Sequence, residues 1–245
     1  MHGSSRVHRL APQCKIVAAL LFVVLISITG RELFGAFAIY ALAVAMVAKI
    51  SGVRIAFVLR RLLVEIPFLL FLVLLPLIAG GETKSLMGLE VSVEGLWVAW
   101  NISIKATLGL ATMIVVGATT PVTELLRGLE KLRTPRIITA IAGFMVRYAD
   151  VVTGEMRRMK IARESRGYNP RWAWQAKALA SSAGSLFIRS FERGERVYTA
   201  MLSRGFDGSL PATAQVRNSS PADWLLSLSL PLVGALAIAI SWVIK

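Results

Sequence analysis

Two short segments combine residue types that can bind an acidic group on another protein. Each segment consists of a serine, an arginine, a glycine and an aromatic residue, at 165–168 and again 38 positions later at 203–206. An arginine guanidinium can donate two parallel hydrogen bonds to a carboxylate, and a glycine readily ends a helix. The repeat therefore predicts a docking site in which two helix ends present fixed cations, formed by Ser165, Arg166, Gly167, Ser203, Arg204 and Gly205.

A simpler function for the same residues is helix capping. An arginine in the last turn of a helix interacts favourably with the helix dipole, and the glycine that follows can adopt the left-handed conformation that closes the helix. Because the pattern occurs twice in one charged segment, the sequence leaves docking and capping equally open.

Enzymatic chemistry is not indicated. The two histidines, His2 and His8, both lie in a polar N-terminal segment, and Cys14 is the single cysteine. One cysteine excludes an intramolecular disulfide and a thiolate metal cluster. The sequence contains no phosphate-binding loop of the form GxxxxGK[ST] and no Ser/His/Asp set. We therefore expect a non-catalytic protein that needs no cofactor and no metal site of its own.

Long apolar runs predict a protein embedded in a lipid bilayer. Hydrophobic residues make up 56% of the 245 positions, and a helix needs about 20 apolar residues to cross the hydrocarbon core. Spans are predicted at 16–29, 33–48, 66–81, 96–120 and 224–244, the first extended towards residue 10 if Lys15 snorkels to the interface. Pro67, Pro76 and Pro231 are expected to kink these helices without breaking them.

The charges predict how the chain is oriented. The net charge is +14, and 127–210 holds 16 Lys and Arg against 7 Asp and Glu, whereas 80–95 holds three Glu and one Lys. The positive-inside rule places the N-terminus and 127–210 in the cytoplasm and 80–95 outside. No basic platform with interleaved aromatic residues is present, so membrane orientation explains the basicity better than nucleic-acid binding.

The predicted fold class is an all-α polytopic membrane protein of about five transmembrane helices plus a cytoplasmic coupling domain of two long amphipathic helices. Its predicted domains are a four-span bundle at 1–120, the coupling domain at 121–211 and a last span at 212–245. Within the coupling domain we expect a tilted or interfacial helix at 136–148, an amphipathic helix from 150 to 166, and a second long helix from about 172 to 204.

One apolar stripe follows the second long helix. Helical spacing aligns Phe187, Phe191, Gly194, Tyr198 and Met201 on one face. We expect this stripe to serve packing within the protein in preference to forming a binding groove, with Gly194 permitting a close approach between helices.

Several of these segments together resemble a known family. The runs 163–168, 189–193 and 200–208, with 119–121 and 145–148, are similar to the transmembrane T component of energy-coupling factor (ECF) transporters, and most similar to its cobalt-type CbiQ members. The likeness is close over 121–211. Both copies of the tetrad carry Ser where the common family motif has Ala before Arg.

The resemblance implies a function without catalytic residues in this chain. In the family, two cytoplasmic coupling helices insert the arginines matching Arg166 and Arg204 into a pair of ABC-type ATPases, and the membrane bundle holds a separate substrate-binding S component. The protein would then lie in the cell inner membrane with a cytoplasmic N-terminus and most simply serve cobalt uptake. Nickel, biotin or another vitamin as substrate, and a membrane scaffold for an unrelated cytoplasmic protein, stay open as alternatives.

Overall fold

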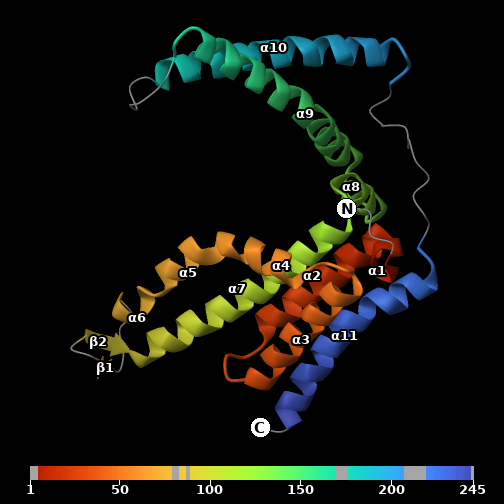
Figure 1. The fold of residues 1–245 in the computed structure, drawn as a ribbon. Coiled ribbons are helices and arrows are strands. Elements are labelled where there is room, and N and C mark those ends of the chain that lie inside the picture. Colours follow the sequence, from red (N-terminus) through yellow and green to blue (C-terminus); the bar gives the residue numbers. More distant parts are fainter. Residues whose placement is uncertain (1–4, 79–82, 87–88, 169–175, 207–218, 244–245) are drawn as a thin grey trace. The chain divides into compact units, whose positions relative to one another are not determined.

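The structure of the protein is a computed structural model that describes residues 5–78, 83–86, 89–168, 176–206 and 219–243 (Figure 1). The chain divides into two compact units. Unit 1 comprises Met1–Gly128 and Val216–Lys245, and unit 2 comprises Leu129–Gln215. The boundary falls inside a helix, eight residues beyond the predicted boundary after residue 120. The division into membrane and cytoplasmic parts stays a prediction.

Unit 1 is a bundle of apolar helices. It contains α1 (Arg6–Arg9), α2 (Pro12–Ile28), α3 (Phe34–Ile50), α7 (Val93–Thr119) and α11 (Pro221–Val243), with α8 (Val122–Lys131) leading into unit 2. Helices α2, α3, α7 and α11 pack on one another. Leucine, valine, isoleucine and alanine fill these helices all round, as expected where the outer face meets lipid and the inner face meets another helix.

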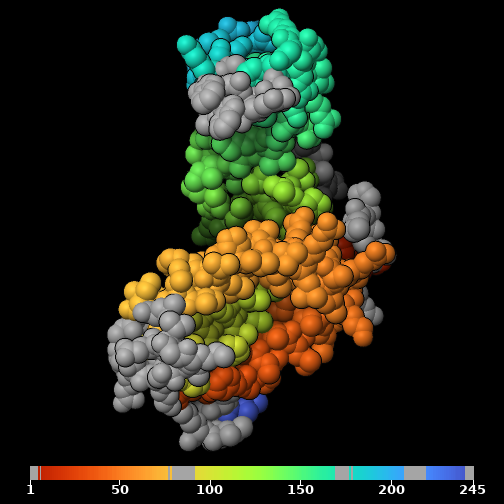
Figure 2. Space-filling model, turned by 60° about the vertical axis from the view of Figure 1, so that its left-hand side comes forward, coloured from red at the N-terminus to blue at the C-terminus, as the bar shows by residue number. Residues whose placement is uncertain are grey.

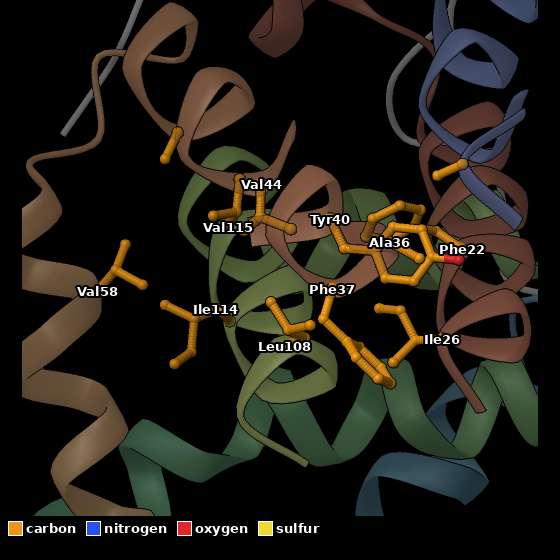
Figure 3. Packing of buried hydrophobic residues seen from close by; sticks show 13 residues of the cluster. Phe22, Ile26, Ala36, Phe37, Tyr40, Val44, Val58, Leu108, Ile114 and Val115 are labelled. Carbon is orange, nitrogen blue, oxygen red and sulfur yellow. The ribbon is translucent and has the colours of Figure 1, made fainter. Parts of the chain in front are cut away.

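The core of this bundle is aromatic and contains one polar contact. The rings of Phe22 and Tyr40 meet edge to face with centroids 5.5 Å apart (Figure 3). The Tyr40 hydroxyl donates a hydrogen bond to the Gly234 carbonyl of α11 at 3.3 Å and lies 2.9 Å from the Thr29 hydroxyl. A buried hydroxyl is costly without such partners, so this network fixes the register of α2, α3 and α11.

The third predicted span is not one helix, which corrects the expectation of kinks without breaks. The described part of the span predicted at 66–81 contains two short helices, α5 (Ile66–Leu72) and α6 (Leu75–Ile78), and it is preceded by α4 (Ile55–Leu62) and the 3₁₀ turn η1 (Leu63–Glu65). Pro67 lies in the first turn of α5 and Pro76 lies inside α6. Proline lacks the N–H that would continue the helix ladder. Figure 2 shows this segment, in orange, along one face of unit 1.

The membrane-protein class is confirmed. Among the described residues, three helices are long and apolar enough to cross a membrane, namely Val93–Thr119, Arg136–Ser165 and Pro221–Ile240. The helices Pro12–Ile28 and Phe34–Ile50 are apolar but shorter. Between α6 and α7 the chain forms a short antiparallel hairpin of β1 (Thr83–Leu86) and β2 (Leu89–Ser92), which the sequence did not predict.

Unit 2 is built on two long helices, α9 (Arg136–Ser165) and α10 (Ala176–Leu202). The predicted separate helix at 136–148 is wrong, because α9 continues through the change in polarity at 148–150 without a break. No proline or glycine stands at that point to end the helix. The predicted start of α10 near residue 172 lies outside the described residues.

Candidate functional site: the arginine-bearing helix ends

The two predicted docking segments form the same structure at two helix ends. At the end of α9, the Gly167 N–H donates to the Glu164 carbonyl at 3.0 Å and the Tyr168 N–H donates to the Arg163 carbonyl at 3.1 Å. At the end of α10, the Gly205 N–H donates to the Leu202 carbonyl and the Phe206 N–H to the Met201 carbonyl, both at 3.0 Å. These paired bonds define a Schellman motif, in which the arginine is the last half-helical residue.

The glycines are required by their backbone conformation. Gly167 has φ +78° and Gly205 has φ +79°, in the left-handed region where an L side chain is strained. A Cβ atom built on either glycine would meet no atom within 4 Å. Conformation, and not crowding within the chain, therefore explains why glycine follows each arginine.

The serines of the two segments act locally. The Ser165 hydroxyl donates to the Ile161 carbonyl, and the Ser203 hydroxyl donates to the Thr199 carbonyl, each at 3.0 Å. Both bonds reach back four residues inside the helix. Ser165 is the last residue of α9 and Ser203 directly follows α10, and both hydroxyls are already used in bonds to their own helix. This fits the Ala that the common family motif has at these positions.

The arginines are exposed. Arg166 and Arg204 both have solvent-accessible side chains, and within the described part of the chain no ion pair or side-chain hydrogen bond holds either guanidinium. By contrast, Arg163 lies over the Tyr168 ring at 5.9 Å from its centroid. The two helix ends therefore present a cation that the described chain leaves available to a partner.

The Schellman geometry alone does not mark a docking site. The end of α8 has the same hydrogen bonds, from the Arg133 N–H to the Glu130 carbonyl and from the Thr134 N–H to the Leu129 carbonyl. There the left-handed position, at φ +65°, is occupied by Arg133 itself and no glycine follows an arginine. The combination of arginine and glycine is what distinguishes the ends of α9 and α10.

A shared carboxylate joins α9 to α10. Glu155 of α9 accepts a hydrogen bond from Arg189 of α10 at 3.0 Å and a second from Arg158 on its own helix. Hydrogen bonds from Arg158 and then Arg189 hold the pKa of the Glu155 carboxyl below its usual value, because they favour the ionised form. The Glu155–Arg189 pair connects two different helices, whereas the pairs Arg158–Glu155, Lys160–Glu164 and Arg196–Glu192 each lie within one helix.

The contact between Glu155 and Arg189 sets the distance between the helix ends that bear Arg166 and Arg204. Ten residues separate Glu155 from the end of α9 at Ser165, and 13 separate Arg189 from the end of α10 at Leu202. At ~1.5 Å per residue these are distances of about 15 Å and about 20 Å from the contact. In Figure 1 the end of α9 lies near the start of α10, whereas the end of α10 lies at its far side. The two arginine-bearing helix ends therefore lie at opposite ends of α10.

The apolar stripe of α10 is exposed, contrary to the expectation that it packs inside the protein. Phe187, Phe191 and Tyr198 are 72%, 59% and 55% exposed. Gly194 does not mediate a close approach, since a Cβ there would meet no atom within 4 Å. The helical spacing of the stripe was predictable from the sequence, but what covers the stripe was not.

A cleft of about 550 Å³ lies beside the stripe, between α9 and α10. Gly194, Tyr198 and Met201 line its α10 side, and Phe144 and Tyr148 line its α9 side. The structure thus brings three residues of the predicted stripe to this cleft, and Phe187 and Phe191 are not among its lining residues. Glu155 and Arg189 also line the cleft, and sequence reasoning missed their pairing because they lie 34 positions apart.

The sequence profile of the cobalt transport protein family CbiQ matches residues 3–214. An energy-coupling factor transporter transmembrane protein EcfT from Brevibacillus brevis is 29% identical over 230 residues, covering 86% of this chain and 84% of the relative.

Two archaeal relatives match over shorter stretches. A putative fused cobalt transport protein CbiMQ from Methanocorpusculum labreanum is 27% identical over 155 residues, which are 61% of this chain. An uncharacterized protein from Methanocaldococcus jannaschii is 32% identical over 112 residues, which are 46% of this chain. The matched regions cover only 26% and 42% of these two relatives' own lengths.

Proposed function

Because this chain belongs to the CbiQ family of cobalt transport proteins, we propose that it is the non-catalytic transmembrane coupling component of an ECF-type importer. Its proposed partners are a pair of ABC-type ATPases and a membrane-embedded S component that binds the substrate. The family match and the similarity to an EcfT protein over most of both chains support this proposal.

The main structural support for the proposal is that two helix ends in unit 2 have the same backbone structure. Each of them exposes an arginine that is followed by a left-handed glycine. Two equivalent docking groups suit a partner made of two equivalent subunits, as an ATPase pair is. Arg166 and Arg204 are proposed to bind acidic groups of one ATPase each, through charge-assisted hydrogen bonds.

Long helices can carry the ATPase movement towards the membrane. A helix is a stiff rod, and the Glu155–Arg189 ion pair ties α9 to α10. When ATP draws the two ATPases together, the arginine ends are proposed to move with them, and the membrane bundle then reorients the S component. The exposed Phe187, Phe191 and Tyr198 supply an apolar surface that the S component is proposed to cover.

Cobalt is the proposed substrate, and the S component is proposed to hold it. The family description and the name of the fused CbiMQ relative support cobalt over nickel, biotin or another vitamin. The N-terminus and unit 2 are proposed to face the cytoplasm, in a protein of the cell inner membrane.

Affinity purification of the full-length protein from its native membrane tests the proposal. We expect an ATPase pair and a small membrane protein to co-purify, and reconstituted vesicles to take up radioactive cobalt only with ATP. Uptake of nickel or a vitamin in place of cobalt would show that the substrate is one of the alternatives and not cobalt. A preparation that lacks any ATPase would favour a membrane scaffold and contradict the proposal.

A further inference from the structure

Helix α8 is where the chain passes from unit 1 into unit 2, since the boundary lies between Gly128 and Leu129. It follows α7 directly, after Thr120 and Pro121. The chain connects the two units at α8 and again at the segment before α11. A movement of unit 2 that is transmitted through the chain therefore reaches the bundle by one of these two connections. The contacts that hold the first part of α8 within unit 1 are therefore important for coupling. The inference below rests on the proposed coupling function.

A buried lysine fixes the junction of α7 and α8. Lys15 of α2 is only 6% exposed. Its ammonium donates to the Thr120 hydroxyl at 3.1 Å, the Thr119 carbonyl at 3.4 Å and the His8 carbonyl at 3.3 Å. An ammonium group has three donors, and a buried charge is tolerated only when such donors are used. Lys15 thus joins the start of α2 to residues 104 and 105 positions away.

A glycine brings α8 onto the same end of α2. Gly128 is buried in α8, and a Cβ atom there would lie 3.0 Å from the Gln13 backbone nitrogen, the Pro12 Cβ and the Ile16 Cδ1. The isoleucine methyl can move aside, but the backbone nitrogen and the proline ring cannot. Glycine in a helix interior costs about 0.5–1 kcal/mol relative to alanine, so its presence here is explained by this close approach.

We infer that Lys15 and Gly128 form an anchor that holds the end of α7 and the following helix α8 against the start of α2, and that both are positioning residues for coupling. Two independent contacts converge on the start of α2: a polar one from Lys15 to the end of α7 and a steric one from Gly128 of α8. The anchor makes the first part of α8 move with the bundle. A loosened anchor lets α8 bend when the coupling helices move, so ATP is hydrolysed without substrate uptake.

The first test examines the contact itself and needs no transport. The Gln13 backbone nitrogen lies at the contact, and the residue as a whole is only 4% exposed. A thiol reagent is added to membranes containing the Gln13→Cys variant in a Cys14→Ser background. We expect slow labelling with Gly128 in place and rapid labelling after Gly128→Leu. Equal labelling rates would show that α8 does not cover this end of α2, and would overturn the inference.

The second test measures uptake per ATP hydrolysed by the complete transporter in vesicles. Overpacking is expected to lower this ratio by roughly tenfold for Gly128→Leu and less for Gly128→Ala, with ATPase retention unchanged. Lys15→Met is expected to lower it as well, and Lys15→Arg to retain more of it because a cation stays. Gly117→Leu and Lys49→Met are matched controls, since Gly117 of α7 faces open space and Lys49 is exposed.

Two results would contradict the coupling role. One is a normal uptake ratio in both Gly128→Leu and Lys15→Met, and the other is an equal loss in the two control variants. A wild-type complex that binds no ATPase would instead refute the proposed function, while the labelling experiment would still decide whether the α2–α8 contact exists.

Discussion

Replacing Gly167 or Gly205 should weaken docking through the backbone alone. Both glycines have a φ near +80°, and the space where a Cβ would lie is empty within 4 Å. The left-handed conformation costs an L-residue roughly 1–2 kcal/mol. Since about 1.4 kcal/mol is a factor of ten, each alanine substitution should reduce the population of the correctly formed helix end by roughly 5- to 30-fold.

The loss of docking caused by each substitution should depend on how poorly the new residue tolerates a positive φ. A β-branched residue is strongly disfavoured there, alanine less so, and asparagine adopts it most readily. Val should therefore impair most, Ala less and Asn least, at Gly167 and at Gly205. The assay is retention of the ATPase pair on the immobilised transporter, followed by cobalt uptake in vesicles. Membrane insertion should be normal in all six variants.

Gly194 provides the matched control. It lies inside α10 and faces open space, but it is not among the glycines with positive φ. Gly194→Ala should stabilise α10 by about 0.5–1 kcal/mol, and docking should be unchanged. The reasoning is refuted if Asn impairs docking as severely as Val, because the glycines would then serve close contact with the partner and not the backbone conformation.

The remaining predictions concern orientation and the ion pair between the coupling helices. Glu94 is exposed at the start of α7. A Glu94→Cys variant that lacks Cys14 should therefore react with a membrane-impermeant thiol reagent only from outside the cell. Reaction from the cytoplasmic side alone would show that the topology is the opposite of the predicted one. Single changes Glu155→Arg or Arg189→Glu should lower uptake, and the two together should restore it unless the pair is dispensable. Because the pKa of Glu155 is lowered in the folded protein, the contact should be intact at and above the ordinary carboxyl pKa of about 4 and be lost as pH falls through the lowered value. Helix crosslinking measured against pH checks this direction.

The sequence predicted the features that follow from local rules. Arginine followed by glycine at the end of a charged helical segment predicted the two caps, and the structure has both glycines at positive φ. Long apolar runs predicted α2, α3, α7 and α11, the third of them interrupted only by Lys105. The prolines of the third run were misjudged, because Pro67 and Pro76 each lie in the first turn of a short helix in place of kinking a long one.

Contacts between distant parts of the chain could not be predicted in this way. The extension of the first span towards residue 10 depended on Lys15 snorkelling to the membrane interface, but Lys15 is buried and bound to the end of α7. The role of Gly128 cannot be predicted from the sequence, because it depends on which helix lies beside this residue. The stripe of α10 was expected to pack internally, yet Phe187 and Phe191 are exposed, and helical periodicity alone does not tell an internal face from one that meets a partner.

The most direct test of the docking function is ATPase retention by the Arg166→Ala, Arg204→Ala double variant. The account predicts that the double variant loses the ATPase pair and cobalt uptake while inserting normally, and that each single variant is affected less. An Arg157→Ala, Arg196→Ala variant is the control, since it removes the same charge from exposed positions of α9 and α10 away from the helix ends. Normal retention and uptake in the Arg166, Arg204 double variant would contradict the account and leave these arginines as helix caps.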